Sequence, residues 1–280
     1  MTEKNSALVS VIMPSYNTGK FIAESIASVV AQTYTDWELI IVDDASTDNT
    51  DEVVQKIIQN GETNKVCHPG RTLEPVILER SDRIRYLKNE KNSGAAECRN
   101  RALREARGRW IAFLDSDDLW TPDKLEKQIA FMESNGYAFS YTRYSEMDEN
   151  GTPTGTVVGG PARISKTGMY NYCWPGCLTV MYDRDVVGNI QIANIRKNND
   201  YAMWLKIIRK ANCYLLAENL ASYRKRTGSI SNHSYMALVK WHYKLYHDAE
   251  GLNPITSLWI TARNLCFGVW KKIKYVEKVK

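Results

Sequence analysis

Acidic side chains follow two apolar runs of this 280-residue sequence. Asp43 and Asp44 end the run ELIIVDD, and Asp115, Asp117 and Asp118 end the run RWIAFLDSDD. Such runs predict buried strands, and ligands of a parallel sheet bind beyond the carboxyl ends of its strands. Carboxylates that share one edge repel each other unless a counter-charge lies between them. Because their oxygens suit Mg²⁺ or Mn²⁺ together with substrate phosphates, the two clusters predict a metal and phosphate site.

Each cluster also has a purely structural interpretation. The sequence Asp43-Asp44-Ala45-Ser46 is typical of a turn whose side chains cap the following helix. Asp118 could serve only to end its strand or to accept a backbone N–H. The metal site is favoured because the two clusters end two strands of one predicted sheet.

The elements that would hold these side chains alternate between strand and helix. An apolar run at 8–13 precedes helical spacing at 21–30, a second run spans 38–44, and an amphipathic helix passes through 53–58. The order strand, helix, strand, helix implies a parallel sheet with helices on its faces, that is, an α/β fold.

The same alternation resumes after an excursion of mixed charge at 60–83, whose role the sequence does not define. Thr121 is expected to cap a helix that has Pro122 in its first turn. The remaining expected strands span 84–87, 109–115, 137–142, 171–183 and 213–223, and the remaining helices span 95–106 and 201–210.

Composition places the chain among ordinary globular proteins. Hydrophobic residues make up 44% and charged residues 25%, which excludes wholesale disorder. No apolar stretch reaches the ~18 residues of a membrane-spanning helix, and no secretory signal is recognisable, so we expect a cytoplasmic protein. Residues 221–280 hold 11 Lys or Arg and only 3 Asp or Glu. This basic end suits an anionic partner.

Two enzyme classes with a similar opening are excluded. A dinucleotide-binding enzyme requires G-x-G-x-x-G after the first strand, whereas the loop PSYNTGK holds one glycine. The G-x-x-x-x-G-K-[ST] loop of P-loop enzymes is also absent from the sequence. No nucleic-acid-binding module is recognisable, so we expect no nucleic acid partner.

Four blocks of the sequence match successive motifs of one known enzyme family. They are VSVIMPSYN, VAQTYTDWELIIVDDASTD, NSGAAECRNRAL and GRWIAFLDSDDLWTPDKLEKQ. In this order they resemble the family-two inverting nucleotide-sugar glycosyltransferases of the bacterial surface-polysaccharide type. The resemblance is dense from residue 8 to about 135 and thinner to about 232.

The resemblance implies a GT-A-like fold, in which a Rossmann-like, mostly parallel central sheet carries flanking helices. The glycosyltransferase domain would span 1–232, with a nucleotide-binding half at about 1–120 and an acceptor half at about 121–232. A basic amphipathic helical extension would follow at 233–280.

The implied donor is a UDP-sugar held by the matching blocks. Pro14, Tyr16 and Asn17 would line the base and ribose, while Asp44, beside Asp43, would accept a hydrogen bond from the uracil imide.

The segment Asp115-Ser116-Asp117 resembles the D-x-D element of the family. Its carboxylates would contact the ribose and bind Mn²⁺ or Mg²⁺, with Asp117 the preferred ligand and Asp115 beside it.

Two basic side chains are implied near the diphosphate. Arg99 borders the donor pocket, where a guanidinium suits phosphate oxygens, and its alternative is a solvated helix residue. In the block YRKRTGSIS, Arg226 or Lys225 would neutralise the leaving group.

Inverting transfer requires one base that removes the proton of the acceptor hydroxyl. The resemblance assigns this role to Asp200, although Asn199 replaces the acid that usually precedes the base. No like charge is then expected beside Asp200 to raise its pKa. A structural alternative, compatible with this role, is that Asp200 caps the helix at 201–210.

The basic end of the chain has one apolar helical face. This face could pack onto the catalytic domain or lie in an anionic membrane surface, since tryptophans and lysines adjoin it. The face comprises Leu258, Ala262, Leu265, Val269, Ile273 and Val276, and the adjoining residues are Trp259, Trp270, Lys271, Lys272 and Lys274.

Relatives that build surface polysaccharides suggest a saccharide acceptor linked to polyprenyl diphosphate. Residues 255–280 would then hold the protein peripherally on the inner face of the cell membrane. The rival hypothesis is a non-catalytic nucleotide-sugar or glycan-binding protein on the same scaffold, which would keep the nucleotide loop but lose the base.

Overall fold

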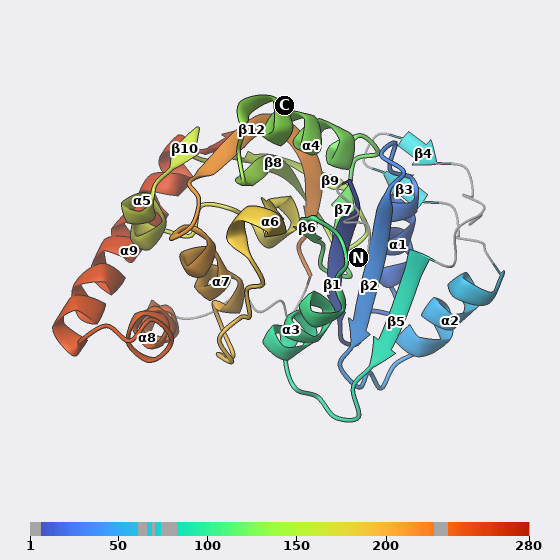
Figure 1. Cartoon of the computed structure of the whole chain (residues 1–280), viewed down its shortest axis with the longest axis horizontal. Coiled ribbons are helices and arrows are strands. Elements are labelled where there is room, and N and C mark those ends of the chain that lie inside the picture. The colour runs from blue at the N-terminus through green and yellow to red at the C-terminus, as the bar shows by residue number, and fades with distance from the viewer. Residues whose placement is uncertain (1–6, 61–65, 69–70, 74–82, 227–234, 280) are drawn as a thin grey trace.

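The computed structural model describes residues 7–60, 66–68, 71–73, 83–226 and 235–279. A central sheet with helices on both faces organises these residues (Figure 1), and the predicted α/β class is confirmed. The main path of the sheet is, in order, β10 (Arg163–Ile164), β12 (Cys213–Arg224), β8 (Phe139–Met147), β11 (Met181–Asp183), β6 (Trp110–Phe113), β1 (Val9–Ser15), β2 (Trp37–Asp43) and β5 (Ile84–Lys88).

The predicted nucleotide end of the sheet is parallel. Strands β6, β1, β2 and β5 are parallel neighbours. Along β1, Val11 and Met13 belong to one core cluster and Ile12 belongs to the other, as expected for a strand buried on both faces. The first cluster includes α1 (Ile22–Val30) and α2 (Thr50–Asn60), and the second includes α3 (Ala95–Glu105) and α7 (Asn199–Ile207).

The other half of the sheet has mixed strand directions. β8 and β12 are parallel to each other, whereas β11 runs antiparallel between β6 and β8. Further elements of this half are β7 (Leu119–Trp120), α4 (Lys124–Asn135), β9 (Pro153–Val158), α5 (Lys166–Asn171) and α6 (Arg184–Val187). Parallel pairing is therefore concentrated in the part of the sheet formed by β6, β1, β2 and β5.

Two local predictions are wrong. Thr121 does not cap α4, because the helix begins at Lys124 with Asp123 at the N-cap position, and the Thr121 hydroxyl donates to Asp123 Oδ1 at 2.7 Å. The predicted strand at 171–183 forms only over Met181–Asp183, since the rest belongs to the end of α5, a loop with Pro175 and a 3₁₀ turn.

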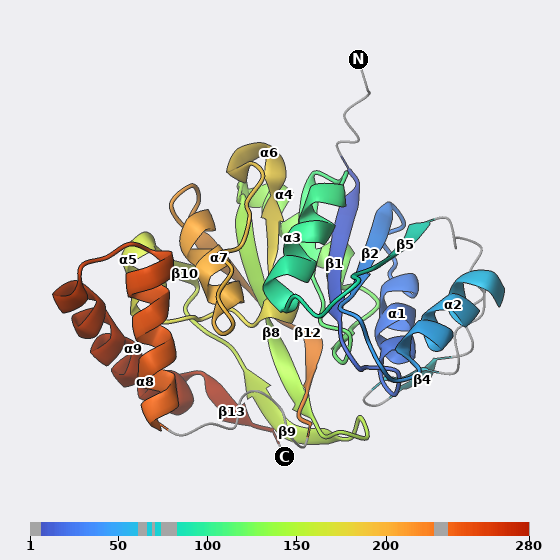
Figure 2. The ribbon, with the colours of Figure 1, turned by 90° about the horizontal axis from the view of Figure 1, so that it is seen from below.

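The chain ends in a helical region, as the sequence predicts. It contains α8 (Tyr235–Lys244), a π-helical turn (Leu245–Ala249), α9 (Pro254–Lys274) and β13 (Val276–Lys278). β13 pairs with β9 and so joins this region to the sheet (Figure 2). The expected domain boundary at 232 lies outside the described residues and stays a prediction. No described helix is long and apolar enough to cross a membrane.

The excursion at 60–83 is described only in part. Its described backbone includes β3 (Val66–His68) and β4 (Arg71–Leu73), which pair antiparallel as a separate two-stranded sheet.

Candidate functional site

The predicted site segments meet beyond the carboxyl ends of β1, β2 and β6. Hydrogen bonds connect the loop after β1 to the loop after β2, and the loop after β2 to the start of α3. From α3, one arginine reaches both the loop after β6 and the first turn of α7. Side chains that are far apart in the sequence therefore share one region.

Asp44 holds the start of α3. Its Oδ1 accepts hydrogen bonds from the Ser93 backbone N–H and from Asn89 Nδ2, both at 2.8 Å, and its Oδ2 accepts the Gly94 N–H at 2.7 Å. A carboxylate is favourable at the positive end of a helix. Gly94 has φ +87°, a conformation that glycine adopts at low cost. These accepted bonds fix the orientation of the carboxylate at the start of α3.

Asp43 forms the expected turn, but it does not cap the next helix. Its carboxylate accepts the backbone N–H of Ser46 at 3.1 Å and the Ser46 hydroxyl. At the start of α2, Asp48 accepts the N–H of Thr50 at 3.0 Å instead. The structural interpretation predicts a turn and a cap on the following helix. The turn is present, but the start of α2 is capped by Asp48 and not by Asp43.

Arg99 connects the predicted metal element to the helix of the predicted base. Its Nη2 donates to Asp115 Oδ1 at 2.5 Å, and its Nη1 donates to Asn199 Oδ1 at 2.7 Å. Arg99 is only 6% exposed, so the alternative of a solvated helix residue is wrong. The guanidinium holds the loop after β6 against α7.

Asp117 faces Arg226. Arg226 Nε lies 2.7 Å from Asp117 Oδ2, whereas Lys225 pairs with Glu146 at 2.6 Å. Of the two basic residues expected near the leaving group, Arg226 is therefore the one beside the D-x-D element. Burial raises the pKa of Asp117, and the charge of Arg226 opposes that shift.

Asp118 has the structural role that the sequence left open. It is 1% exposed, and its Oδ1 accepts the backbone N–H of Arg224 on β12 at 2.8 Å. Burial, followed by the charges of Asp117 and Asp115, raises its pKa well above the usual range. Ser116, between the D-x-D carboxylates, is also buried.

The sequence does not single out Arg224, whose buried side chain holds the loop after β6 in place through hydrogen bonds. Its guanidinium donates to the carbonyls of Asp117 at 2.8 Å and Glu149 at 3.0 Å, and to Glu24 Oε2 at 2.5 Å. The adjacent basic residues Arg224, Lys225 and Arg226 are a signal in the sequence. Only the register of β12 shows which of them is buried.

Asp200 lies in the first turn of α7, one residue after the start of the helix at Asn199. The N-cap position is Asn198, so the structural alternative in which Asp200 caps this helix is wrong. Asp200 Oδ1 accepts the N–H of Tyr201 at 2.8 Å. Burial raises the pKa of Asp200, the charge of Arg99 opposes the shift, and Asp115 adds to it. The adjacent Asn199 carries no charge, as the sequence implies, but Asp115 supplies a like charge from a distant segment.

Strained backbone surrounds this region. Asn17, Ala45 and Asn198 are the non-glycine residues with positive φ in the described ranges, at 51°, 60° and 58°. They lie after β1, after β2 and before α7. Such conformations cost about 1–3 kcal/mol each and concentrate at functional sites.

The residues expected around the base differ in exposure. Tyr16 is 47% exposed, and Asn17, also exposed, accepts the Thr47 N–H at 2.8 Å. Pro14 is buried within β1 opposite Val42, beyond the last β1–β6 pair, where a missing N–H is tolerated.

Few side chains of the candidate site could bind a metal ion. No group of three or more His, Cys, Asp or Glu side chains suited to a metal occurs in the ranges that the structure covers. Asp115 and Asp117 supply two carboxylates, which fits Mg²⁺ or Mn²⁺ when substrate phosphates and water complete the shell. Arg99 and Arg226 already supply part of the counter-charge that the sequence argument assigns to a cation.

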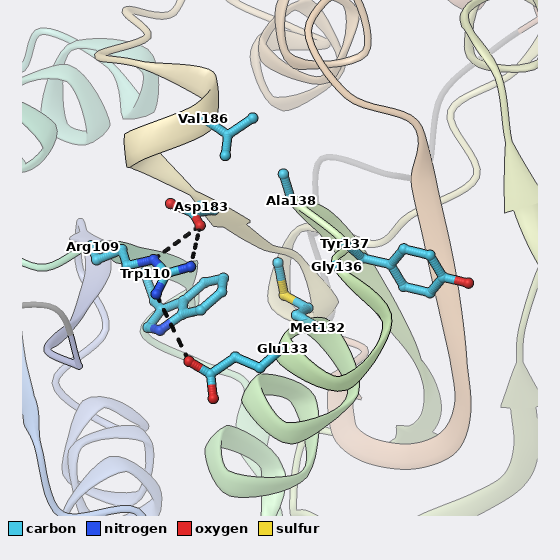
Figure 3. Close-up of a pocket in the computed structure, with 9 residues that line it drawn as sticks. All are labelled: Arg109, Trp110, Met132, Glu133, Gly136, Tyr137, Ala138, Asp183 and Val186. Carbon is cyan, nitrogen blue, oxygen red and sulfur yellow. Dashed lines mark hydrogen bonds and ion pairs between the residues drawn. The ribbon is translucent and has the colours of Figure 1, made fainter.

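A pocket of about 400 Å³ lies at the other end of β6 (Figure 3). In it, Arg109 donates to Asp183 Oδ2 at 2.7 Å and lies 3.8 Å from Glu133. Arg109 and Trp110 precede or begin β6, whereas the aspartates follow its carboxyl end. This pocket is therefore separate from the candidate site.

Comparison with protein-family models identifies the family of this chain. The model described as "Glycosyl transferase family 2" matches residues 10–174, more than half of the chain. The chain belongs to glycosyl transferase family 2. The resemblance carried by the four sequence blocks is thereby confirmed, and the protein is a glycosyltransferase.

Two relatives match this family-2 glycosyltransferase over nearly its whole length. TuaG of Bacillus subtilis (strain 168), named for teichuronic acid biosynthesis, is 40% identical over 253 residues, which is 90% of this chain and 92% of TuaG. WfgD of Escherichia coli is 37% identical over 270 residues, 94% of each chain. It is named as a UDP-Glc:alpha-D-GlcNAc-diphosphoundecaprenol beta-1,3-glucosyltransferase.

A solved structure supports the fold. Staphylococcus aureus TarS 1-349, crystallised with UDP-GlcNAc, superposes with a TM-score of 0.66 at 20% identity, covering 92% of this chain and 70% of that chain. The GT-A-like fold of the glycosyltransferase is confirmed.

Proposed function

We propose that the glycosyltransferase moves a sugar from a UDP-sugar to a saccharide hydroxyl with inversion, using Asp200 as the base. One observation carries this proposal. Arg99 donates to Asp115 and to Asn199, the neighbour of Asp200, so the candidate donor element and the candidate base adjoin the same buried guanidinium. A non-catalytic binding protein would have no need of a carboxylate there.

The chemistry of the site suits proton removal. A base works best when its pKa lies near the working pH, and burial raises the pKa of Asp200 toward that range. Arg226 is 32% exposed beside Asp117, so its charge can stabilise a departing diphosphate. Asp115 and Asp117 would hold Mg²⁺ or Mn²⁺, which would supply further positive charge to the diphosphate.

On the donor side, Asp44 is the proposed acceptor for the uracil imide. Its carboxylate lies directly after β2, and the hydrogen bonds that it accepts fix its orientation at the start of α3. Asp43 stabilises the adjoining turn, and the exposed Tyr16 and Asn17 are proposed to contact the base and ribose, with Pro14 beneath them.

The acceptor is proposed to be a saccharide on a polyprenyl diphosphate, in polysaccharide biosynthesis. The support comes from WfgD, whose name specifies UDP-Glc and a diphosphoundecaprenol-linked acceptor, and from TuaG, whose name specifies teichuronic acid biosynthesis. Enzymes with such acceptors work at a membrane surface, so peripheral attachment belongs to the same proposal.

A donor screen tests this function. Purified protein is incubated with UDP- and GDP-sugars, with Mg²⁺, Mn²⁺ or a chelator, and release of the nucleotide is measured with and without a GlcNAc-diphosphate lipid. We expect lipid-dependent release from a UDP-sugar only. Release from GDP-sugars alone, or none with any donor, would contradict the proposal.

Metal removal provides a separate prediction. Chelation should weaken UDP binding measured by calorimetry, and Asp117→Ala should abolish the dependence of that binding on Mn²⁺. Asp148→Ala, an acidic residue of the β8–β9 turn, is the control. Metal-dependent affinity that persists in Asp117→Ala would refute the ligand role.

A further inference from the structure

Helix α9 turns its apolar face to solvent. Large apolar side chains along it are between 48% and 81% exposed, and Ala262 and Cys266 between them are exposed as well. At 100° per residue these positions form one stripe along a helix of about 30 Å. The large side chains are Ile255, Leu258, Trp259, Val269, Trp270 and Ile273.

The opposite face of α9 is buried and carries polar side chains beside Ile260 and Phe267, which pack against the core. Asn264 Nδ2 donates to the hydroxyls of Tyr246 at 3.0 Å and Tyr201 at 3.2 Å, and Lys271 Nζ donates to the Trp174 carbonyl at 2.8 Å. Ser257 Oγ donates to the Asn253 carbonyl at 2.9 Å. The hydrogen bonds of Asn264 and Lys271 to other elements fix α9 in one rotation, because turning the helix would leave these two side chains unpaired.

An ordinary surface helix turns its large apolar side chains inward, whereas α9 leaves a stripe of them exposed. The alternative that the apolar face packs onto the catalytic domain is wrong for Leu258, Val269 and Ile273. Lys271, expected beside the membrane, points inward instead. An exposed apolar stripe of this length marks a surface that another body covers.

The charge around the stripe favours one kind of partner. Arg263, Lys272 and Lys274 lie on α9, and Lys274 Nζ is 5.4 Å from the Trp270 ring. α9 contains no Asp or Glu. A second copy would therefore bring only like charges to an α9–α9 contact, whereas anionic lipid headgroups would neutralise them.

We propose that α9 lies in the plane of an anionic membrane, with its apolar stripe among the acyl chains and its basic side chains at the headgroups. Figures 1 and 2 both place α9 at the end of the molecule away from α2 and β5, where no other described element covers it from outside. The proposal stands on α9 and does not depend on the proposed acceptor.

Docking would also orient the candidate site. Asn264 on α9 is hydrogen-bonded to Tyr201, the residue after Asp200, and Tyr201 also donates to the Met169 carbonyl of α5 at 2.6 Å. These contacts connect the membrane-facing helix to the first turn of α7 through buried hydrogen bonds. The height of Asp200 above the bilayer would then be set by the position of α9.

Vesicle flotation of the full chain tests the proposal without donor or acceptor. The vesicles are phosphatidylcholine alone, or phosphatidylcholine mixed with phosphatidylglycerol. We expect binding to the mixed vesicles, weakened about tenfold or more in Leu258→Gln/Val269→Gln/Ile273→Gln. Lys272→Gln/Lys274→Gln should lose several-fold affinity for the mixed vesicles only.

The control is Val186→Gln on α6, which removes an apolar side chain that is 56% exposed far from α9 along the chain. It should bind as the unaltered protein does, and UDP affinity should be unchanged in every variant. Failure of the unaltered protein to bind, or equal binding by the triple variant, would overturn the proposal. So would a dimer that the triple variant dissociates without a change in vesicle binding, because the stripe would then be a self-association face.

Discussion

Arg99 shows how a single side chain can connect two segments of the candidate site. Its planar guanidinium reaches Asp115 and Asn199 at once, and it does so while 6% exposed. Breaking a buried ion pair by removing one partner costs about 3–5 kcal/mol, so the contact also contributes to stability. Burial converts a residue expected to contact phosphate into one that positions other groups.

We expect Arg99→Lys to lower kcat by about tenfold to a hundredfold, because an ammonium cannot hold both partners in a fork and small displacements of reacting groups are costly. UDP affinity should change less than kcat. The matched control is Arg104→Lys on the same helix, where the arginine is 51% exposed in its pair with Glu97. Equal turnover of Arg99→Lys and the control would show that the bridge has no positioning role.

The pH dependence of the reaction should reflect Asp200. Burial raises its pKa; the charged and titratable groups that face it are Arg99, Asp115 and the thiols of Cys173 and Cys177. A base acts in its deprotonated form, so activity should fall as the pH decreases through the pKa of Asp200. This fall should occur at a higher pH than the pKa of an ordinary aspartate, which is about 4. Arg99→Gln removes a cation and should move this limb of the kcat/KM profile to still higher pH. An unmoved limb would assign it to another group.

The loops between elements store backbone strain where the donor is proposed to bind. Ala45 has φ +60° directly after the Asp43-Asp44 pair, and Asn17 has φ +51° in the loop hydrogen-bonded to it. In L-residues other than glycine this region is unfavourable. Both loops are held by the hydrogen bonds of Ser46 and Thr47, which make the strained conformation the stable one.

Ala45→Gly should stabilise the protein by about 0.5–1 kcal/mol in thermal or denaturant unfolding, because relief of the left-handed strain outweighs the entropy cost of glycine. Ala23→Gly within α1 is the control and should destabilise by a similar amount. A destabilised Ala45→Gly would show that no strain is stored at this position.

At the scale of the whole molecule, the sequence predicts the parallel strands and the acids at their ends, because both depend on local apolar runs. It does not predict how α9 is oriented. A face of Asn264 and Lys271 is buried only because Tyr201, Tyr246 and a backbone carbonyl meet it, and those partners come from distant segments. Which face of a helix is buried therefore depends on contacts with distant segments, and not only on the local pattern of apolar residues.

The same limit applies to the candidate site. The positions of Asp115, Asp117 and Asp200 follow from motifs, whereas the burial of Arg99 and Arg224 follows from which neighbours surround them. The like charge that acts on Asp200 comes from Asp115, not from the adjacent residue as the family pattern implies. Electrostatic contacts between segments are visible only once the chain is folded.

Asp200 is proposed as the base of a site that also binds the donor. The measurement is turnover of Asp200→Asn together with its UDP affinity by calorimetry, with Asp185→Asn, an acid in the first turn of α6, as the control. Transfer should fall by at least about a hundredfold, while UDP affinity and the control remain unchanged. Undiminished transfer by Asp200→Asn would show that Asp200 is not the base.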